Sequence, residues 1–473
     1  MKNDRYRHDR EEIKELLIQY DNLRMGRPNS FIEKEGFERL IEYFDDKDQL
    51  QTALVVCEYA INQYPNTASL LLLKANLLVV TKQYKEGLLL LDESELLDNS
   101  DSNLYILKTE AYLALDMQQK AAEVLENAIE LFDGDDKIDL LFELADVYDD
   151  YENFEKVFDC LVLILKQDPA NEEALYKICF WTDFTGRNEE SITLHKEIIE
   201  EQPFNELAWF NLGAAYQGIK LHEKAIDAYS YVTAINEKFE NAYRNMGDAY
   251  LRLRKYKESI EMLEKVLELS MPEPVIYEAI GHCYDRLEKF AQARFYYKKA
   301  SHLDTQDVRM HYKIACTYMN EAAWQSAIKC LYTALKPNPM QPDYNLALGQ
   351  CYMQMNNMDE ALTCFGNVVR MRPKNVSGWT ELLKCLLQAN QFEEGIEYAH
   401  YAYEQTEHKP IFQFYKSMFL FAAGKSKEAL LVLENAMMLA PKFIKKFIQL
   451  DPRILKNKQV VALIARYKKK SSR

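Results

Sequence analysis

Glycine and proline, the residues that interrupt regular structure, are scarce in this sequence. There are 14 Gly and 13 Pro among 473 residues, beside 31 Tyr and 22 Phe. Sheet sandwiches and α/β enzymes need many turns rich in Gly and Pro, so the scarcity favours a long array of helices. Apolar residues make up 48% and charged residues 28%, which is typical of a folded chain and too apolar for a disordered one.

The sequence also shows no pattern typical of a signal peptide or of a membrane-spanning stretch. The first ten residues are largely charged, and no apolar core of about 7–15 residues follows them. The most apolar stretch, residues 70–80, is interrupted by Lys74 and Asn76 and is far shorter than the roughly 20 residues that a bilayer requires. We therefore expect a cytoplasmic protein with no integral membrane segment.

Motifs for redox, metal and catalytic chemistry are absent as well. The nine cysteines are odd in number, dispersed, and never in Cys-x-x-Cys spacing, which argues against a disulfide framework and a zinc knuckle. No glycine-rich phosphate loop, His-Glu-x-x-His pair or Gly-x-Ser-x-Gly turn occurs. We therefore predict that this chain is not an enzyme and uses no cofactor, no metal and no small-molecule substrate.

What the sequence has is a period of 34 residues. Stepping from Gly213 by 34 in both directions, eight of nine positions hold a small residue, and so do eight of the nine positions twelve residues later. Three residues after the first series, most positions hold a tyrosine. Nine units without insertion or deletion indicate an internal repeat. The first series is Ala145, Cys179, Gly213, Gly247, Gly281, Ala315, Gly349, Leu383 and Ser417.

Each repeat is predicted to be a pair of antiparallel helices. Apolar residues recur at helical spacing in two stretches of about a dozen residues, which a polar turn such as residues 254–257 separates. Such a hairpin cannot bury its apolar face alone, so neighbouring hairpins must stack. We expect the small residues to let the paired backbones approach, the tyrosine to fill the wedge between hairpins, and a proline such as Pro203 to end the second helix.

These residues resemble the tetratricopeptide repeat. The segment from Trp209 to Tyr216, followed by Ala225 and Tyr229, is similar to that family's signature almost residue for residue. Looser copies upstream bring the total to about twelve. The resemblance implies an all-α fold, an α-solenoid in which stacked antiparallel helix pairs form a right-handed superhelix with capping helices.

Three regions are predicted along the chain. Residues 1–33 hold a polar capping helix, and residues 34–443 hold the repeats, with a regular 34-residue register from 138 to 443. Residues 444–473 hold a basic capping helix, with its helical pattern over 454–467. The end helices should shield the outermost hairpins, whose apolar faces would otherwise meet water.

The family resemblance implies that the first helices of successive hairpins line a concave groove that binds ligands. Inward positions there combine aromatic side chains with Arg, Asn and His, a mixture that suits an extended peptide. Asn211 and Asn245, 34 residues apart, resemble the start of the asparagine ladder of O-linked N-acetylglucosamine transferase, whose amides grip a peptide backbone. The carboxylate clamp of chaperone-binding relatives is not matched, because Asn76 lacks its lysine partner. The predicted groove residues are Tyr176, Lys177, Phe180, Phe210, Asn211, Arg244, Asn245, Asp248, His282, Arg286 and Lys313.

Charge is spread unevenly along the chain, whose net charge is −16. Residues 85–168 hold 23 acidic and 6 basic residues, whereas residues 441–473 hold 11 basic and 1 acidic residue. The acidic block is either a solvated outer face or a docking surface for a basic partner. The overall negative charge, and the lack of aromatic residues interleaved with the C-terminal lysines, argue against a nucleic-acid partner.

These observations predict a non-catalytic adaptor that binds a protein or an extended peptide in the concave groove. Two alternatives stay open. One is a structural or regulatory subunit of an assembly that docks through the acidic outer surface at residues 85–168. The other is a helper of an enzyme encoded elsewhere.

Overall fold

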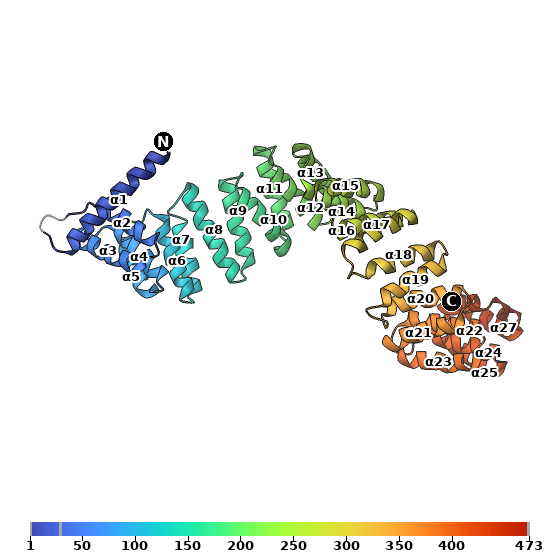
Figure 1. The fold of residues 1–473 in the computed structure, drawn as a ribbon. Helices are drawn as coiled ribbons and strands as arrows, with labels where there is room; N and C mark the ends of the chain where they lie inside the picture. The colour runs from blue at the N-terminus through green and yellow to red at the C-terminus, as the bar shows by residue number, and fades with distance from the viewer. Residues whose placement is uncertain (1, 28–30, 471–473) are drawn as a thin grey trace. The chain divides into compact units, whose positions relative to one another are not determined.

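The computed structural model describes residues 2–27 and 31–470, and within these ranges the chain forms helices and turns with no strand. It divides into two compact units, residues 1–242 (unit 1) and residues 243–473 (unit 2). Figure 1 shows that within each unit consecutive helices run antiparallel and stack side by side. The predicted all-helical, tandem arrangement is confirmed. None of the helices in the described ranges combines the length and apolar character that crossing a bilayer requires.

Apart from α1 and α8, the helices of unit 1 differ little in length. They are α1 (Lys2–Arg24), α2 (Lys34–Asp45), α3 (Leu50–Gln63), α4 (Ala68–Val80), α5 (Tyr84–Leu97), α6 (Ser102–Ala114), α7 (Gln118–Ala128), α8 (Gly134–Asp150), α9 (Phe154–Gln167), α10 (Glu172–Thr185), α11 (Asn188–Glu201), α12 (Glu206–Gly218) and α13 (His222–Ile235). The boundary between the units falls inside α14 (Glu240–Arg252).

Unit 2 continues the alternation and ends in shorter segments. Its elements are α15 (Tyr256–Leu269), α16 (Pro274–Arg286), α17 (Phe290–Leu303), α18 (Arg309–Asn320), α19 (Trp324–Leu335), α20 (Pro342–Gln354), α21 (Met358–Met371), α22 (Val376–Gln388), α23 (Phe392–Gln405), α24 (Ile411–Ala422), α25 (Ser426–Leu439), the 3₁₀ turn η1 (Pro441–Phe443), α26 (Ile444–Leu450), the 3₁₀ turn η2 (Pro452–Lys456) and α27 (Lys458–Lys470).

The turn inside each hairpin repeats one backbone feature. From α2/α3 to α24/α25 the described residues form twelve hairpins, and each turn has one residue in the left-handed region, with φ between +56° and +80°. These residues follow one another at 34-residue steps, except for a step of 36 where α8 extends to 17 residues. They are Asp48, Lys82, Asp116, Glu152, Gly186, Lys220, Arg254, Glu288, Ala322, Asn356, Asn390 and Gly424.

The core of each hairpin is a pair of positions whose sizes compensate. A methyl group added to Gly213 would lie 2.5 Å from the ring of Tyr229, and one added to Gly349 would lie 2.6 Å from the ring of Phe365. In these pairs the small residue of the first helix makes room for a large buried side chain 16 residues later, on the second helix. The same two positions hold a smaller first residue in ten of the twelve hairpins, and Ile41/Cys57 and Leu383/Ala399 reverse the order. The twelve pairs are Ile41/Cys57, Ala75/Leu91, Thr109/Leu125, Ala145/Leu161, Cys179/His195, Gly213/Tyr229, Gly247/Leu263, Gly281/Tyr297, Ala315/Leu331, Gly349/Phe365, Leu383/Ala399 and Ser417/Leu433.

The ends of the array are covered by additional helical segments. Tyr20 of α1 is buried and packs near Phe44 of the first hairpin. At the other end Val460 and Ile464 of α27 are buried against the last hairpin. The helix predicted over residues 454–467 begins later than expected, because the side chain of Asn457 caps α27 by accepting a hydrogen bond from the backbone N–H of residue 459 at 3.0 Å.

Candidate peptide-binding surfaces

An exposed aromatic patch covers one side of α10 in unit 1. Tyr176, Phe180 and Phe184 follow at intervals of four, so they share one face of the helix. They are 64%, 61% and 57% exposed. Phe154 of α9 and Trp181 extend the patch, with the Phe154 ring centroid 4.8 Å from that of Phe184 and 5.3 Å from that of Trp181. Because contiguous exposed apolar patches mark interaction sites, this aromatic patch is a candidate contact surface.

Local sequence sets the limits of α10. The Asn171 side chain accepts a hydrogen bond from the backbone N–H of Ala174 at 3.0 Å and caps the first turn. Gly186, at φ +73°, ends the helix in a conformation that glycine adopts without steric cost. The helix packs on α9 and α12 but only lightly on its own hairpin partner, α11.

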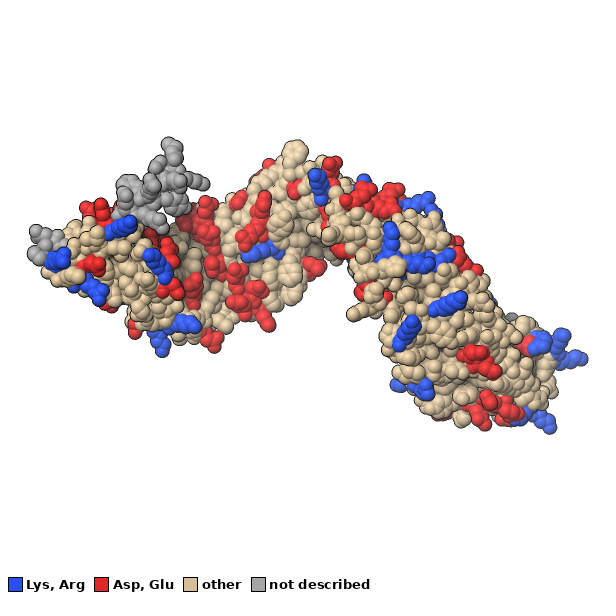
Figure 2. Space-filling view, viewed as in Figure 1, with Lys and Arg blue, Asp and Glu red and all other residues tan. Residues whose placement is uncertain are grey.

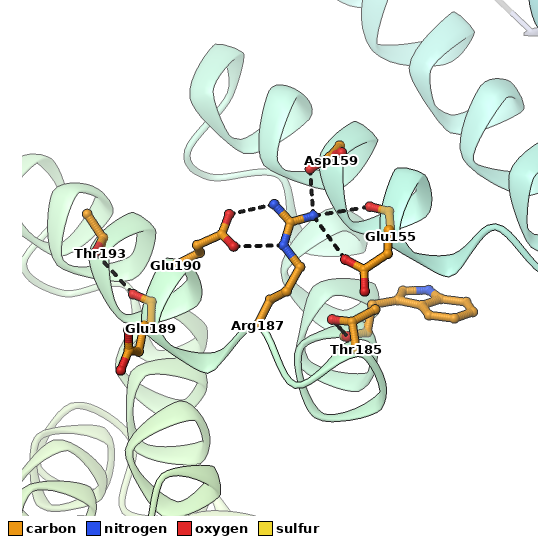
Figure 3. A network of polar contacts seen from close by, with 8 residues as sticks. Glu155, Asp159, Thr185, Arg187, Glu189, Glu190 and Thr193 are labelled. Carbon is orange, nitrogen blue, oxygen red and sulfur yellow. Dashed lines mark hydrogen bonds and ion pairs between the residues drawn. The ribbon is translucent and has the colours of Figure 1, made fainter.

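Arg187 ties the turn after α10 to the preceding hairpin (Figure 3). Its Nη1 donates to Asp159 Oδ1 at 2.6 Å and to the backbone carbonyl of Glu155 at 3.2 Å, while its Nε donates to Glu190 Oε1 at 2.9 Å. The hydrogen bonds with Glu190 and Asp159 raise the pKa of the guanidinium. The guanidinium carbon also lies 4.3 Å from the ring centroid of Phe158. This network fixes the start of α11 against α9, where packing between α10 and α11 is thin.

The second helix of the same hairpin buries a titratable side chain. His195 is fully buried, and its Nδ1 lies 2.7 Å from the backbone carbonyl of Ser191. Its Nε2 has no hydrogen-bond partner among the described residues. Burial lowers the pKa of His195 to about 4. The ring is therefore neutral near pH 7, with Nδ1–H as the donor to the carbonyl.

Lys177 lies beside the aromatic patch and is engaged within unit 1. Its Nζ lies 2.9 Å from a carboxylate oxygen of Glu173 and 3.7 Å from one of Asp146. The ammonium also lies 4.9 Å from the ring centroid of Phe142. A ligand carboxylate would have to compete with these two acidic partners for the lysine.

Phe210 and Asn211 of α12 lie deeper than the patch. Phe210 is half-buried, with its ring centroid 5.6 Å from that of Tyr229 and 5.2 Å from that of Phe239. Asn211 is 3% exposed, and its Nδ2 donates to the backbone carbonyl of Leu175 at 2.7 Å. The Asn211 amide thus joins α12 to α10, and its burial leaves it out of the contact surface proposed below.

In unit 2, three of the predicted groove residues lie on α14. Arg244 forms a two-pronged ion pair with Glu273, with nitrogen–oxygen distances of 2.8 and 3.0 Å. The hydrogen bonds from Arg244 lower the pKa of the Glu273 carboxyl. Asp248 lies 3.4 Å from the Nε of Arg252, and Asn245 is half-buried between these charged groups along the helix.

The remaining predicted residues of unit 2 form a charged cluster on α16 and α18. Lys313 of α18 donates to the carboxylate of Glu278 on α16. Burial lowers the pKa of His282, and the nearby charge of Lys313 lowers it further. Burial raises the pKa of Asp285, one of whose buried oxygens has no hydrogen-bond partner among the described residues. Arg286 is exposed, and its Nε donates to a tyrosine hydroxyl of α15 at 3.2 Å.

These positions bring together aromatic, cationic and amide groups on first helices, separately in each unit. Unit 1 contributes the aromatic patch and Lys177, and unit 2 contributes the charged cluster around His282 and Lys313. Within the described part of the chain no group of three metal-ligating side chains gathers. Such a mixture can hold an extended peptide by ring contacts and charged hydrogen bonds.

Acidic side chains gather on unit 1, as Figure 2 shows over its middle hairpins. The acidic block at residues 85–168, which lies in unit 1, contributes 23 of the acidic side chains. Within it Lys108 is 5% exposed and donates to Asp92 at 2.6 Å and to Glu95. Most other acidic side chains of the block have no ion-pair partner among the described residues, so this face carries a negative field.

Two family descriptions match the chain. "Tetratricopeptide repeat protein 21 C-terminal ARM domain" matches residues 215–346, and "Tetratricopeptide repeat" matches residues 347–410. The chain carries tetratricopeptide repeats. The tetratricopeptide hairpins upstream of residue 215 continue the same turn geometry and the same size-compensated pairs.

Solved structures of repeat proteins are similar to parts of this chain. YrrB, described as having an unusual peptide-binding site, is 21% identical over 39% of this chain and 95% of its own, with a TM-score of 0.35. The C-terminal part of a repeat protein from Cytophaga hutchinsonii is 17% identical over 51% of this chain and 99% of its own, with a TM-score of 0.45. A chain of the Cut9–Hcn1 hetero-tetramer is 14% identical over 84% of this chain and 97% of its own, with a TM-score of 0.34. No curated protein sequence matches the tetratricopeptide chain.

Sequence reasoning missed the part of the aromatic patch that comes from the neighbouring hairpin. Phe154 begins the second helix α9, and the predicted groove drew only on first helices. Trp181 lies between two patch residues in sequence and packs against both. The density of aromatic residues at 180, 181 and 184 is a signal that could have found Trp181, whereas Phe154 lies outside that stretch of sequence.

Proposed function

We propose that the protein is a non-catalytic interaction scaffold, located in the cytoplasm, that binds an extended segment of a partner protein. The aromatic patch on α10 carries the proposal, because three adjacent aromatic side chains are more than half exposed there. Aromatic side chains dominate binding energy at protein interfaces and need an apolar partner surface to be covered.

The polar groups around the patch support a peptide as the ligand. Lys177 can turn from its two acidic partners toward a peptide carboxylate or carbonyl, since it is partly exposed at the patch edge. In unit 2 the charged cluster around His282 and Lys313 offers a second, more polar contact surface. We propose the two surfaces as separate sites, one in each unit.

Replacement of the patch aromatics tests the proposal. The variant Phe180→Ser/Phe184→Ser should lose the partners that the wild-type chain retains in affinity purification from its native cell. Phe204→Ser is the matched control, because Phe204 is an aromatic of the same unit that is 83% exposed and outside the patch. Identical partners for wild type and both variants, with unchanged thermal unfolding, would refute the aromatic patch as the binding site.

A second candidate function is docking through the acidic block at residues 85–168, which the negative face in Figure 2 favours. In that case the patch variant would keep its partners. Replacing Glu93, Asp98 and Glu130 by Lys would release them instead.

A further inference from the structure

A cleft of about 990 Å³ opens at the C-terminal end of unit 2, away from the predicted groove residues. Its walls come from the first turns of α22 and α24 and from the segment that joins α25 to α26. Val376, Ile411, Leu439 and Phe443 give it an apolar lining, and Leu439 is 62% exposed. An apolar lining of this kind is costly to leave in water and favours an apolar ligand group.

Three lysines rim this cleft. Lys409, Lys442 and Lys446 line it, and none of its lining residues is acidic. Within the described ranges none of the three lysines has a carboxylate partner at ion-pair distance. The ammonium groups of Lys442 and Lys446 lie 5.4 and 5.8 Å from the ring centroid of Phe443, so charge and apolar surface adjoin. The cleft therefore suits an apolar side chain flanked by carboxylates, rather than a polyanion that offers only charge.

The chain itself displays such a segment in unit 1. At the end of α5, Leu96 is 88% exposed and Leu97 is 47% exposed. Glu93 and Asp98 flank them and are exposed, with no cation paired to either among the described residues. This acidic leucine segment, residues 93–98, belongs to the acidic block. It combines exposed leucines with carboxylates, which complement the apolar lining and the lysines of the cleft, called the basic cleft below.

We propose that the acidic leucine segment of one copy of this chain docks in the basic cleft of a second copy. The contact is heterologous, with different surfaces on the two partners, so it links copies head to tail and can extend beyond a pair. At about 0.1 M salt the screening length is near 10 Å, so the facing charges act while the net charge of −16 is largely screened. The proposal does not depend on peptide binding at the aromatic patch.

Sedimentation equilibrium of the full chain tests the contact. A single small interface predicts association with a dissociation constant on the order of 100 µM, so the average mass should rise above 55.5 kDa at high protein concentration. Leu96→Glu alone and Lys442→Glu/Lys446→Glu alone should each stay at the monomer mass. A mixture of these two variants should form pairs and stop there, because one intact cleft meets one intact segment.

Matched variants separate this contact from general charge effects. Leu89→Glu changes another exposed leucine of α5, and Lys456→Glu/Lys458→Glu makes the same charge change outside the cleft. Both should associate as the wild type does. A wild-type chain that stays monomeric, or a mixture that forms no pairs, would overturn the proposal. Loss of phosphatidylserine vesicle binding in Lys442→Glu/Lys446→Glu, with a monomeric wild type, would assign the cleft to lipid headgroups instead.

Discussion

Both units build the same hairpin, and within each unit the core pair changes from one hairpin to the next. In unit 1 the large partner is leucine in three successive hairpins, opposite Ala or Thr, and then becomes a histidine. In unit 2 Gly281 and Gly349 face aromatic rings, whereas Leu383 stands opposite Ala399. In most pairs a small side chain lies opposite a large one, although leucine lies opposite Gly, Ala or Thr in different hairpins. The glycine pairs show that the two positions compete for the same space, so the size of one side chain limits the size of the other.

Exchanging the sizes of the two side chains within one core pair should have the largest effect on the free energy of unfolding. Leu383 is fully buried, so Leu383→Gly should lower the free energy of unfolding by about 4 kcal/mol through a cavity and a helical glycine. Adding Ala399→Phe should restore roughly half of that loss, since it recreates the Gly/Phe pair of an adjacent hairpin. Urea unfolding followed by circular dichroism measures both. No recovery in the double variant would show that the two positions do not share volume.

A methyl group placed at the small position should have the next largest effect. Gly349→Ala would put a carbon 2.6 Å from the Phe365 ring and should cost about 2 kcal/mol. Gly366→Ala is the control, because nothing lies within 4 Å of the added carbon. That variant should gain up to about 1 kcal/mol from helix propensity. Equal effects of the two substitutions on the unfolding midpoint would contradict the close packing.

The histidine of unit 1 should make its hairpin sensitive to acid. The pKa of His195 is lowered to about 4 in the fold, below its ordinary value near 6.5, so the unfolded chain binds the proton more readily. The contribution of neutral His195 to the free energy of unfolding is fully present above about pH 6.5 and is lost as the pH falls toward 4. By pH 5 the free energy of unfolding should be lower by about 2 kcal/mol. Hydrogen exchange of α10 and α11 measures this. In His195→Leu, which copies the preceding hairpins, the added pH dependence should disappear.

The arginine network of unit 1 should have the smallest effect. Arg187→Met should lower the free energy of unfolding by about 1 kcal/mol, because a partly buried guanidinium loses several charged hydrogen bonds. Arg309→Met in unit 2 is the control, since among the described residues Arg309 pairs with nearby Asp307 alone and its side chain is 67% exposed. It should change stability by less than about 0.5 kcal/mol. Similar losses in the two variants would refute a structural role for the network.

The hairpin architecture followed from the sequence because apolar period and turn spacing are local properties. The number of hairpins and the pairing of neighbouring helices were predictable for that reason. What the period could not show is which side chains are already engaged. Asn211 sits at a ligand-facing position of the pattern, yet the Leu175 carbonyl of the preceding hairpin takes its amide. This contact joins two hairpins through residues that are 36 positions apart in the chain, so the sequence of a single repeat does not predict it.

The left-handed turn residues have a consequence for engineering heat resistance. Ten of the twelve are not glycine, and each such residue raises the energy of the native backbone by roughly 1 kcal/mol. All of them sit where two helices of one hairpin join, and of the ten only Glu152 lies next to the aromatic patch, two residues before Phe154. Glycine at the joints other than Asp116 and Glu152, which belong to the acidic block, would let the array tolerate higher temperatures in independent steps, while the aromatic patch, the acidic block and the basic cleft keep their present chemistry.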